Sequence, residues 1–265
     1  MTSRPGPTRI RKLPDERRAE ILRTAARIAL EEGLERITLR RVADELGVRP
    51  GLIGHYFPAA DNLVSEAFAD AAAKERDALL PAAEEDLPPA DRLARFLARL
   101  DDASSRDLSR LWLNARHLSR FKEGLREVVE GQEAVTRGAL TALVEDGVKA
   151  GEFTTDDPLG AALHILVVVD GLGAYANGST DVGHPAIDGM AMATADRVLG
   201  LAPGTLRGRP PPEHAAACRL PSPWQQACQG QELTDSHAAA PGRRYVSSSR
   251  GRAEPRLSRE REGEP

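Results

Sequence analysis

The stretch ADELGVRPGLIGHYF, residues 43–57, places turn-forming residues and a run of poor helix formers directly after a run of good ones. Thr38 can cap the helix that precedes the turn, because its hydroxyl can accept a hydrogen bond from a free backbone N–H. Gly47 ends that helix, and Pro50 suits the first turn of the next one, where a missing N–H costs nothing. The sequence therefore predicts two short helices joined by a tight turn.

The second of these helices, predicted over residues 50–56, has two unlike faces. Ile53 and Phe57 are four residues apart and can anchor the helix to a core. The other face carries Gly51, Leu52, Gly54 and His55. Glycine inside a helix costs about 1 kcal/mol relative to alanine, so helix stability does not explain this composition. Close approach of a DNA backbone would explain it; the alternative is an ordinary glycine-containing loop.

An upstream helix completes a three-helix unit over residues 15–60. Asp15 can cap it, and Gly33 can end it. Between them lies one apolar stripe, formed by Ile21, Leu22, Ala25, Ile28 and Ala29. A helix, a tight turn and a short second helix form the helix-turn-helix signature, whose second helix can lie in a DNA major groove.

Charge is distributed unevenly along the 265 residues, although the net charge is only −4. Basic residues outnumber acidic ones by 12 to 8 in residues 1–60, and acidic residues outnumber basic ones in residues 61–202. Before the first acidic residue, the arm formed by residues 1–14 includes Arg9, Arg11 and Lys12. We expect this arm to contact DNA phosphates; a disordered, solvated start is the alternative.

Several classes of protein are disfavoured by the sequence. It lacks a signal peptide and an apolar run of about 18 residues, so we expect a cytoplasmic protein with no membrane partner. The only cysteines, Cys218 and Cys228, fit neither a disulfide framework nor a usual zinc spacing. No nucleotide-binding, hydrolase or metalloprotease motif occurs in a fitting context. We therefore expect no enzyme activity, no cofactor and no metal.

The segment ITLRRVADELGVRPGLIGHYFPAADNLVSEAF, residues 37–68, resembles the DNA-binding segment of tetracycline-repressor (TetR) family regulators. The resemblance covers about residues 15–70. Within the family, GLIGHYF is similar to the choline-responsive repressors of betaine synthesis, a weaker resemblance. It implies a dimeric, all-helical repressor that has a small N-terminal DNA-binding domain and a larger C-terminal domain binding a small molecule.

The resemblance also implies roles for single residues. It assigns phosphate contacts to Thr38 and Tyr56, a groove contact to His55 and close approach of the DNA to Gly51. Simple packing remains the alternative for the two aromatic side chains. The family often has Ser or Thr where Arg49 stands, so this arginine could instead pair with a guanine. The DNA sequence that this protein prefers should therefore differ from the one common in the family.

Residues 61–202 read as helices throughout, so the fold class is all-α. A connecting helix covers residues 61–80, and a later helix is apolar nearly all round from Leu159 to Val169, which predicts burial on more than one side. The last helix carries small residues at Gly189, Ala191, Ala193 and Ala195. As the resemblance implies, these last two helices would pair with those of a second copy in a homodimer; the core of a monomer is the alternative.

The sequence says least about a small-molecule effector. Its candidate pocket residues are aromatic, or are polar residues expected to point inward: Phe68, Phe96, Trp112, Asn114, His117, Phe121, His164 and Asp170. Packing in the core is the favoured alternative for Trp112. A choline-like cation would need an aromatic cage, for which one Trp and scattered Phe give little support.

Residues 203–265 are rich in Arg, Pro, Ser, Gly and Ala and are predicted to be a disordered tail. Taken together, the sequence predicts a ligand-responsive regulator, a repressor by expectation. It would bind a palindromic double-stranded DNA operator as a dimer and be released by an effector of unknown identity. An all-helical interaction module and a constitutive DNA-binding regulator without effector are the alternatives.

Overall fold

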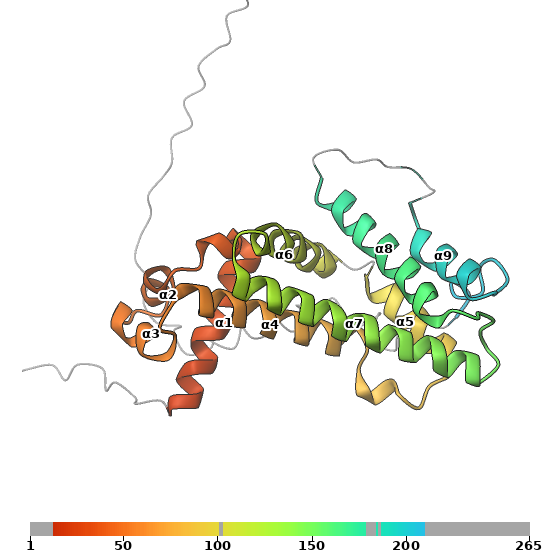
Figure 1. The fold of residues 1–265 in the computed structure, drawn as a ribbon, viewed down its shortest axis with the longest axis horizontal. Helices are drawn as coiled ribbons and strands as arrows, with labels where there is room; N and C mark the ends of the chain where they lie inside the picture. Colours follow the sequence, from red (N-terminus) through yellow and green to blue (C-terminus); the bar gives the residue numbers. More distant parts are fainter. Residues whose placement is uncertain (1–12, 101–102, 179–183, 185–186, 210–265) are drawn as a thin grey trace, which may run out of the picture. The chain divides into compact units, whose positions relative to one another are not determined.

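The computed structural model of the chain describes residues 13–100, 103–178, 184 and 187–209, all of which lie within one compact unit, Met1–Cys228 (Figure 1). Within these residues every regular element is helical, which confirms the predicted all-α class. The helices are α1 (Pro14–Glu32), α2 (Leu39–Glu45), α3 (Pro50–Tyr56), α4 (Ala60–Leu79), α5 (Pro89–Leu100), α6 (Ala103–Ser119), α7 (Glu123–Lys149), α8 (Pro158–Ala176) and α9 (Met190–Val198), with short 3₁₀ turns η1 (Leu34–Arg36) and η2 (Ala82–Glu84). Most of the predicted arm and tail lie outside the described residues.

The helix-turn-helix forms as its local sequence predicts. Thr38 Oγ1 accepts a hydrogen bond from the backbone N–H of Arg41 at 2.9 Å, which caps α2. Gly47 adopts φ +61°, a left-handed conformation that favours glycine, and the chain then enters α3 at Pro50. The predicted cap of the first helix is wrong: α1 begins at Pro14, so Asp15 lies in its first turn, where a negative charge is favourable.

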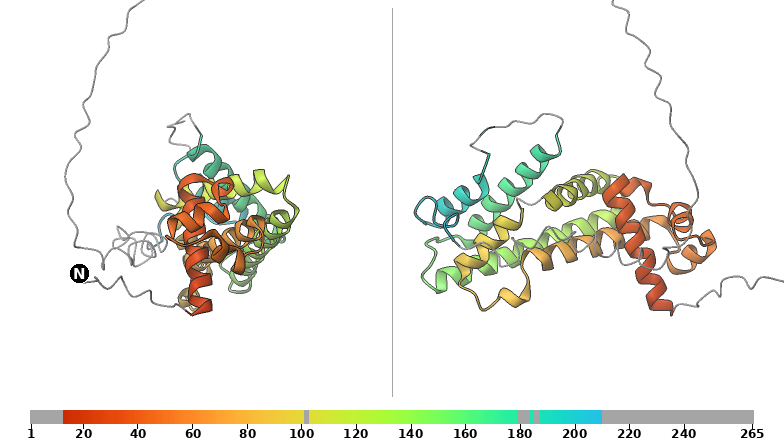
Figure 2. Two further views of the ribbon diagram at one scale, coloured as in Figure 1. Left: turned by 90° about the vertical axis from the view of Figure 1, so that its left-hand side faces the viewer. Right: turned by 180° about the vertical axis from the view of Figure 1, so that it is seen from behind.

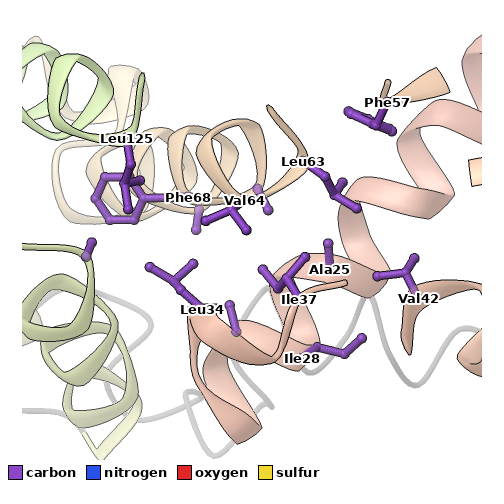
Figure 3. Close-up of a cluster of buried hydrophobic side chains, with 14 of the residues drawn as sticks. Ala25, Ile28, Leu34, Ile37, Val42, Phe57, Leu63, Val64, Phe68 and Leu125 are labelled. Atoms are coloured by element: carbon purple, nitrogen blue, oxygen red, sulfur yellow. The ribbon is translucent and has the colours of Figure 1, made fainter. Parts of the chain in front are cut away.

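One hydrophobic core joins the N-terminal domain, α1 to α3, to the helices that follow it. Ile28, Leu34, Phe57 and Leu63 are fully buried, and Figure 3 shows them with Leu125 of α7 in one cluster. The cluster also includes residues of α4 and α6. The predicted boundary at residues 60 and 61 coincides with the start of α4, but the core crosses it. We conclude that α4, α6 and α7 hold the N-terminal domain in place.

A second core lies between α5, the later part of α7, α8 and α9. Figure 2 shows α4 and α7 side by side, and these two helices are in contact, so they connect the two cores. Gly147 of α7 packs against the ring of Phe153, where an added Cβ would lie 2.0 Å from a ring carbon. This position therefore requires glycine.

Residues after the predicted end of the body at residue 202 are also packed. The buried carboxylate of Asp196 accepts hydrogen bonds from the backbone N–H groups of Gly204, at 2.7 Å, and Leu206, at 3.1 Å. Leu206 is itself buried, and Arg209 forms a 2.6 Å ion pair with Asp91 of α5. The folded body therefore extends at least to Arg209, because these contacts satisfy a carboxylate that burial would otherwise penalise.

Helix α8 was predicted to be buried on more than one side, but within a single chain only one side of it is buried. Ala161, Ala162 and Ile165 enter the second core, but Leu163 and Val167 are 41% and 68% exposed. In the described part of the chain, α8 alone is long and apolar enough to cross a membrane, judged by length and composition only. However, α8 contacts α6, α7 and α9, and its inner face packs in the second core as that of a core helix does. The outer face remains apolar and uncovered.

Candidate nucleic-acid interface and ligand cavity

Helix α3 presents the two faces that its sequence predicts. Ile53 and Phe57 are completely buried, whereas Gly51 and His55 are exposed and Leu52 and Gly54 are half-buried. A Cβ on Gly51 would meet nothing within 4 Å, and one on Gly54 would lie 3.9 Å from Leu39 Cδ1. Neither glycine is therefore required by packing inside the chain, which leaves the close approach of a partner as its physical explanation.

Thr38 and Tyr56 differ in how free they are. Thr38 is exposed and its hydroxyl oxygen accepts from the Arg41 N–H, so the hydroxyl hydrogen remains able to donate to a phosphate. Tyr56 is half-buried, packs against the first core, and meets the ring of His55 edge-on at 5.3 Å between centroids. Packing and phosphate contact are compatible for Tyr56, because a tyrosine can bury its ring and leave its hydroxyl in water.

The arginines near the turn divide into two kinds. Arg41 is held by Glu32 and Glu45, each at 2.5 Å, and hydrogen bonding to Arg41 lowers the pKa of both carboxyl groups. Arg49 is exposed, and its side chain makes no hydrogen bond or ion pair with another residue that the structure describes. Arg40 has an 86% exposed side chain and only a long, 3.9 Å pair with Asp44. Arg49 and Arg40 are thus available to a ligand, and Arg41 is structural.

The sequence analysis did not predict a DNA contact for Arg40. A basic residue two positions after the Thr38 cap was the feature that indicated it. Arg9, Arg11 and Lys12, predicted to contact phosphates, lie outside the described residues.

The C-terminal domain contains a cavity of about 1450 Å³ lined by residues of α4 to α9. Three of the predicted pocket residues line it: Phe96, Trp112 and Asp170. Phe68 lies behind the wall, where its ring meets Trp112 edge-on at 4.9 Å. The indole of Trp112 packs on the first core, as its favoured alternative predicts, and it also faces the cavity. A contact between Trp112 and a ligand stays a prediction.

The other four predicted pocket residues do not line this cavity. Asn114 bonds to the backbone of Leu34, at the junction between α1 and α2. His117 contacts the ring of Phe121 near the end of α6, and Phe121 is 75% exposed. His164 is exposed on α8. Their polarity or aromatic character suggested a pocket, but the helical register turns them elsewhere.

Glu75 of α4 is an acidic group in the cavity wall that the sequence analysis missed. Its Oε2 accepts a 2.6 Å hydrogen bond from the indole N–H of Trp112. Burial raises the pKa of Glu75, and the bond from Trp112 opposes part of this rise. The signal was present in the sequence, since Glu75 follows Ala71 by four residues and Phe68 by seven on the apolar stripe of α4.

Arg116, one turn after Trp112, joins three helices at the cavity. Its Nε donates to Glu133 of α7 at 2.7 Å, and its Nη2 donates to Asp170 of α8 at 2.8 Å. The guanidinium also lies 5.4 Å from the centre of the Trp112 ring. The chain thus places its own cation on the face of its only cavity-lining tryptophan within the described residues.

The described residues contain no group of three or more His, Cys, Asp and Glu side chains that could hold a metal ion. Cys218 and Cys228 lie outside them.

A short exposed helix behind a tight turn, followed by a helical domain that contains an open cavity, is the arrangement of a helix-turn-helix DNA-binding protein with a separate C-terminal domain. Comparison with protein families identifies both the N-terminal and the C-terminal domain. Residues 21–67 match the model of bacterial regulatory proteins of the tetR family, and residues 89–200 match the C-terminal domain of BetI-type transcriptional repressors. The chain is a TetR-family transcriptional regulator with a BetI-type C-terminal domain, a family of non-enzymatic proteins.

Individual relatives are distant. The chain is 24% identical over 165 residues to the HTH-type transcriptional regulator PksA of Bacillus subtilis, which covers 61% of this chain and 79% of PksA. A regulator from Saccharomonospora viridis, solved in complex with choline, superposes with a TM-score of 0.57 at 22% identity, over 69% of this chain and 95% of that one. A regulator from Pseudomonas aeruginosa PAO1 gives a TM-score of 0.59 at 23% identity, over 74% and 95%. These structures share the fold.

Proposed function

We propose that the protein is a ligand-responsive repressor that binds a palindromic operator as a homodimer and leaves it when an effector enters the cavity. The observation that carries this proposal is the pairing of two sites on one chain. An exposed, glycine-bearing α3 flanked by the unpaired Arg49 suits a major groove, and a cavity lies in the domain behind it. A regulator without an effector would have no need of that cavity.

A second copy is the occupant that we propose for the outer face of α8. Leu159, Leu163 and Val167 recur every four residues on that face and are between 41% and 68% exposed. Leu163 and Val167 also line the cavity, so this face adjoins it. Burying such side chains contributes about 25 cal/mol per Å² of apolar surface. In α9 the small residues contribute less than predicted, because Ala191 and Ala195 are buried in the chain's own core and Ala193 alone of these three is exposed. We therefore expect α8 to supply most of the contact.

Symmetry gives the dimer its function. One short helix such as α3 reads few base pairs, whereas two copies related by a two-fold axis read two half-sites of a palindrome.

Two helices run from the cavity to the N-terminal domain. Helix α4 carries Glu75 at the cavity and begins at Ala60, four residues after the end of α3 at Tyr56. Helix α6 carries Trp112 at the cavity and Asn114 at the α1–α2 junction. A ligand that favours another position of either helix would change the spacing of the two α3 helices in a dimer and so release the operator.

The cavity gives little support to choline as the effector. A quaternary ammonium needs several exposed aromatic faces. Tyr175 lines the cavity and is 62% exposed, but Phe96 is buried. Arg116 covers the face of Trp112, where Glu133 and Asp170 hold it. Choline is the ligand of the Saccharomonospora viridis structure. We propose that this chain responds to a different molecule.

Sequencing the genomic DNA fragments that the purified protein retains, followed by gel shifts on the enriched site, tests the proposal. We expect a palindromic site, bound by a dimer in analytical ultracentrifugation. Leu159→Glu, on the outer face of α8 but not in the cavity wall, should give a monomer with much weaker operator binding. The exposed Val135→Glu on α7 is the matched control. Retention of random DNA alone, or a monomer that binds the operator as tightly, would contradict the proposal.

A further inference from the structure

Basic side chains outnumber acidic ones in the cavity wall, and some of the basic ones have no acidic partner. The described lining residues include five arginines, Arg76, Arg106, Arg116, Arg137 and Arg207, and four acids, Glu75, Glu133, Asp170 and Asp188. Two of these acids are already used by one cation, because Glu133 and Asp170 both bind Arg116. Burial raises the pKa of a third, Glu75, which favours its neutral form. The wall is left with an excess of positive charge.

Three of the five arginines have partners within the chain. Besides Arg116, Arg76 donates to Gln132 at 2.9 Å, and Arg207 donates to the backbone carbonyl of Asp188 at 2.9 Å. The side chains of Arg106 and Arg137 make no hydrogen bond or ion pair with any residue that the structure describes. Arg106 is exposed, whereas Arg137 is half-buried. Arg137 therefore places a guanidinium without a protein partner in the cavity wall, where a ligand can reach it.

Most of the remaining wall is apolar, although Ser109, Thr136, Tyr175 and His184 also line it. Around the arginines it is formed mainly by Leu79, Phe96, Leu97, Leu100, Leu113, Leu166, Val169, Leu172 and Met192. Ligand pockets are typically about 300 to 1000 Å³, so a cavity of about 1450 Å³ has room for far more than a small polar ion. A molecule that fills it must therefore combine a large apolar body with a group that suits a guanidinium.

We infer that the effector is an amphipathic anion, a carboxylate on an apolar body, whose carboxylate binds Arg137. A guanidinium matches a carboxylate with two parallel N–H donors, and such charge-assisted bonds are the strong ones. The apolar body would lie against the leucine-rich wall. This inference rests on the proposed function, because it names the chemistry of the effector that the proposal requires.

Three probes of equal chain length separate the head groups. Isothermal titration of the full-length protein with sodium decanoate, 1-decanol and decyltrimethylammonium, each below its micelle concentration, compares an anion, a neutral molecule and a cation on one apolar body. We expect decanoate to bind most tightly. Arg137→Gln should weaken decanoate tenfold or more and leave decanol unchanged, because the variant loses the charge but keeps polar donors. Arg126→Gln, on the same helix but paired with Glu123 away from the cavity, should bind like the wild type.

No binding of decanoate, tighter binding of the ammonium probe, or unchanged decanoate affinity in Arg137→Gln would each overturn the inference. A circular dichroism melt shows whether Arg137→Gln folds, and Arg137→Lys, which keeps the charge but loses the paired donors, should recover part of the affinity. Gel shifts without any ligand report on the proposed function separately. Operator binding with failed decanoate binding would reject the anionic effector alone, whereas failure to bind any operator would reject the regulator itself.

Discussion

The side-chain oxygen of Asn114, on α6, accepts a 2.7 Å hydrogen bond from the backbone N–H of Leu34, in the turn between α1 and α2. The same asparagine donates from Nδ2 to Glu35 at 3.0 Å, and Arg110 of α6 donates to the backbone carbonyl of Leu30 at 2.7 Å. A helix that lines the cavity thus bonds directly to the backbone of the N-terminal domain.

Replacing this asparagine should loosen that junction. In Asn114→Ala the N–H of the fully buried Leu34 loses its acceptor, which should lower the free energy of unfolding by about 1 to 3 kcal/mol. Urea unfolding measures the loss. Hydrogen exchange should speed up at the Leu34 amide but not at the Val42 amide, which bonds to the Thr38 carbonyl. Equal exchange at Leu34 in both proteins would show that the bond is unimportant in solution.

Single changes of arginines near the turn should separate base contact from structural support. Arg49→Ala should cost about 1 to 3 kcal/mol on the operator and relax the preference at one symmetric position per half-site, if Arg49 pairs with a guanine. Arg40→Ala should weaken operator and random DNA alike and reduce the salt dependence, as expected for a phosphate contact. Arg41→Ala should act mainly on stability, because it breaks the pairs with Glu32 and Glu45. Gel shifts of Arg49→Ala on randomised half-sites measure its base preference. A base preference equal to that of the wild type would exclude a base contact by Arg49.

Bulk on the exposed face of α3 should block DNA without harming the fold. A Cβ at Gly54 has ordinary contact with Leu39, so Gly54→Tyr should unfold at nearly the wild-type temperature and yet bind the operator far more weakly. Gly138→Ala on α7, where an added Cβ meets nothing within 4 Å, is the control for a glycine away from the interface. Normal operator binding by Gly54→Tyr would mean that DNA does not approach this face closely.

The buried carboxyl of Glu75 should make stability fall as the pH rises. Its pKa is raised above the ordinary value of 4.5, so the folded state holds a proton that the unfolded state has lost, and this contribution disappears as the pH passes the folded pKa. Glu75→Gln keeps an acceptor for the Trp112 N–H but carries no charge.

Relative to the wild type, Glu75→Gln should therefore gain stability as the pH rises above 4.5, the ordinary pKa of the carboxyl group. Urea unfolding of both proteins as the pH is raised tests the difference. A stability difference that is constant with pH would show that Glu75 titrates normally.

The C-terminal limit of the folded body should lie after Arg209 rather than at residue 201. A chain ending at Arg209 should dimerise and bind the operator like the full length. A chain ending at Leu201 loses the two backbone donors to Asp196 and should be clearly less stable, because a buried carboxylate is left without partners. Thermal melts of the two truncated chains give the answer, and equal stability would remove the role assigned to residues 204–206.

Local features were well predicted from the sequence, and features that depend on register over a long helix were not. The Thr38 cap, the Gly47 turn and the bounds of α3 follow from residues within a few positions of each other, and all three were correct. Asn114 and His117 lie within five residues of Trp112, yet they point away from the cavity that Trp112 lines. Each helical residue turns about 100°, so the neighbouring helices decide which polar side chain faces a cavity.

The all-helical class, the helix-turn-helix and the family can be predicted from the sequence, because caps, turns and apolar stripes act over less than about two helical turns. Which charged side chains stay without a partner depends on the packing of the helices. Arg41 and Arg49 are both arginines beside the same turn, but Glu32 from α1 holds the first and nothing described holds the second. In the cavity, Arg116 is paired and Arg137 is not for the same reason. The partners of Arg116 come from α7 and α8, so its pairing depends on how the folded chain brings these helices together.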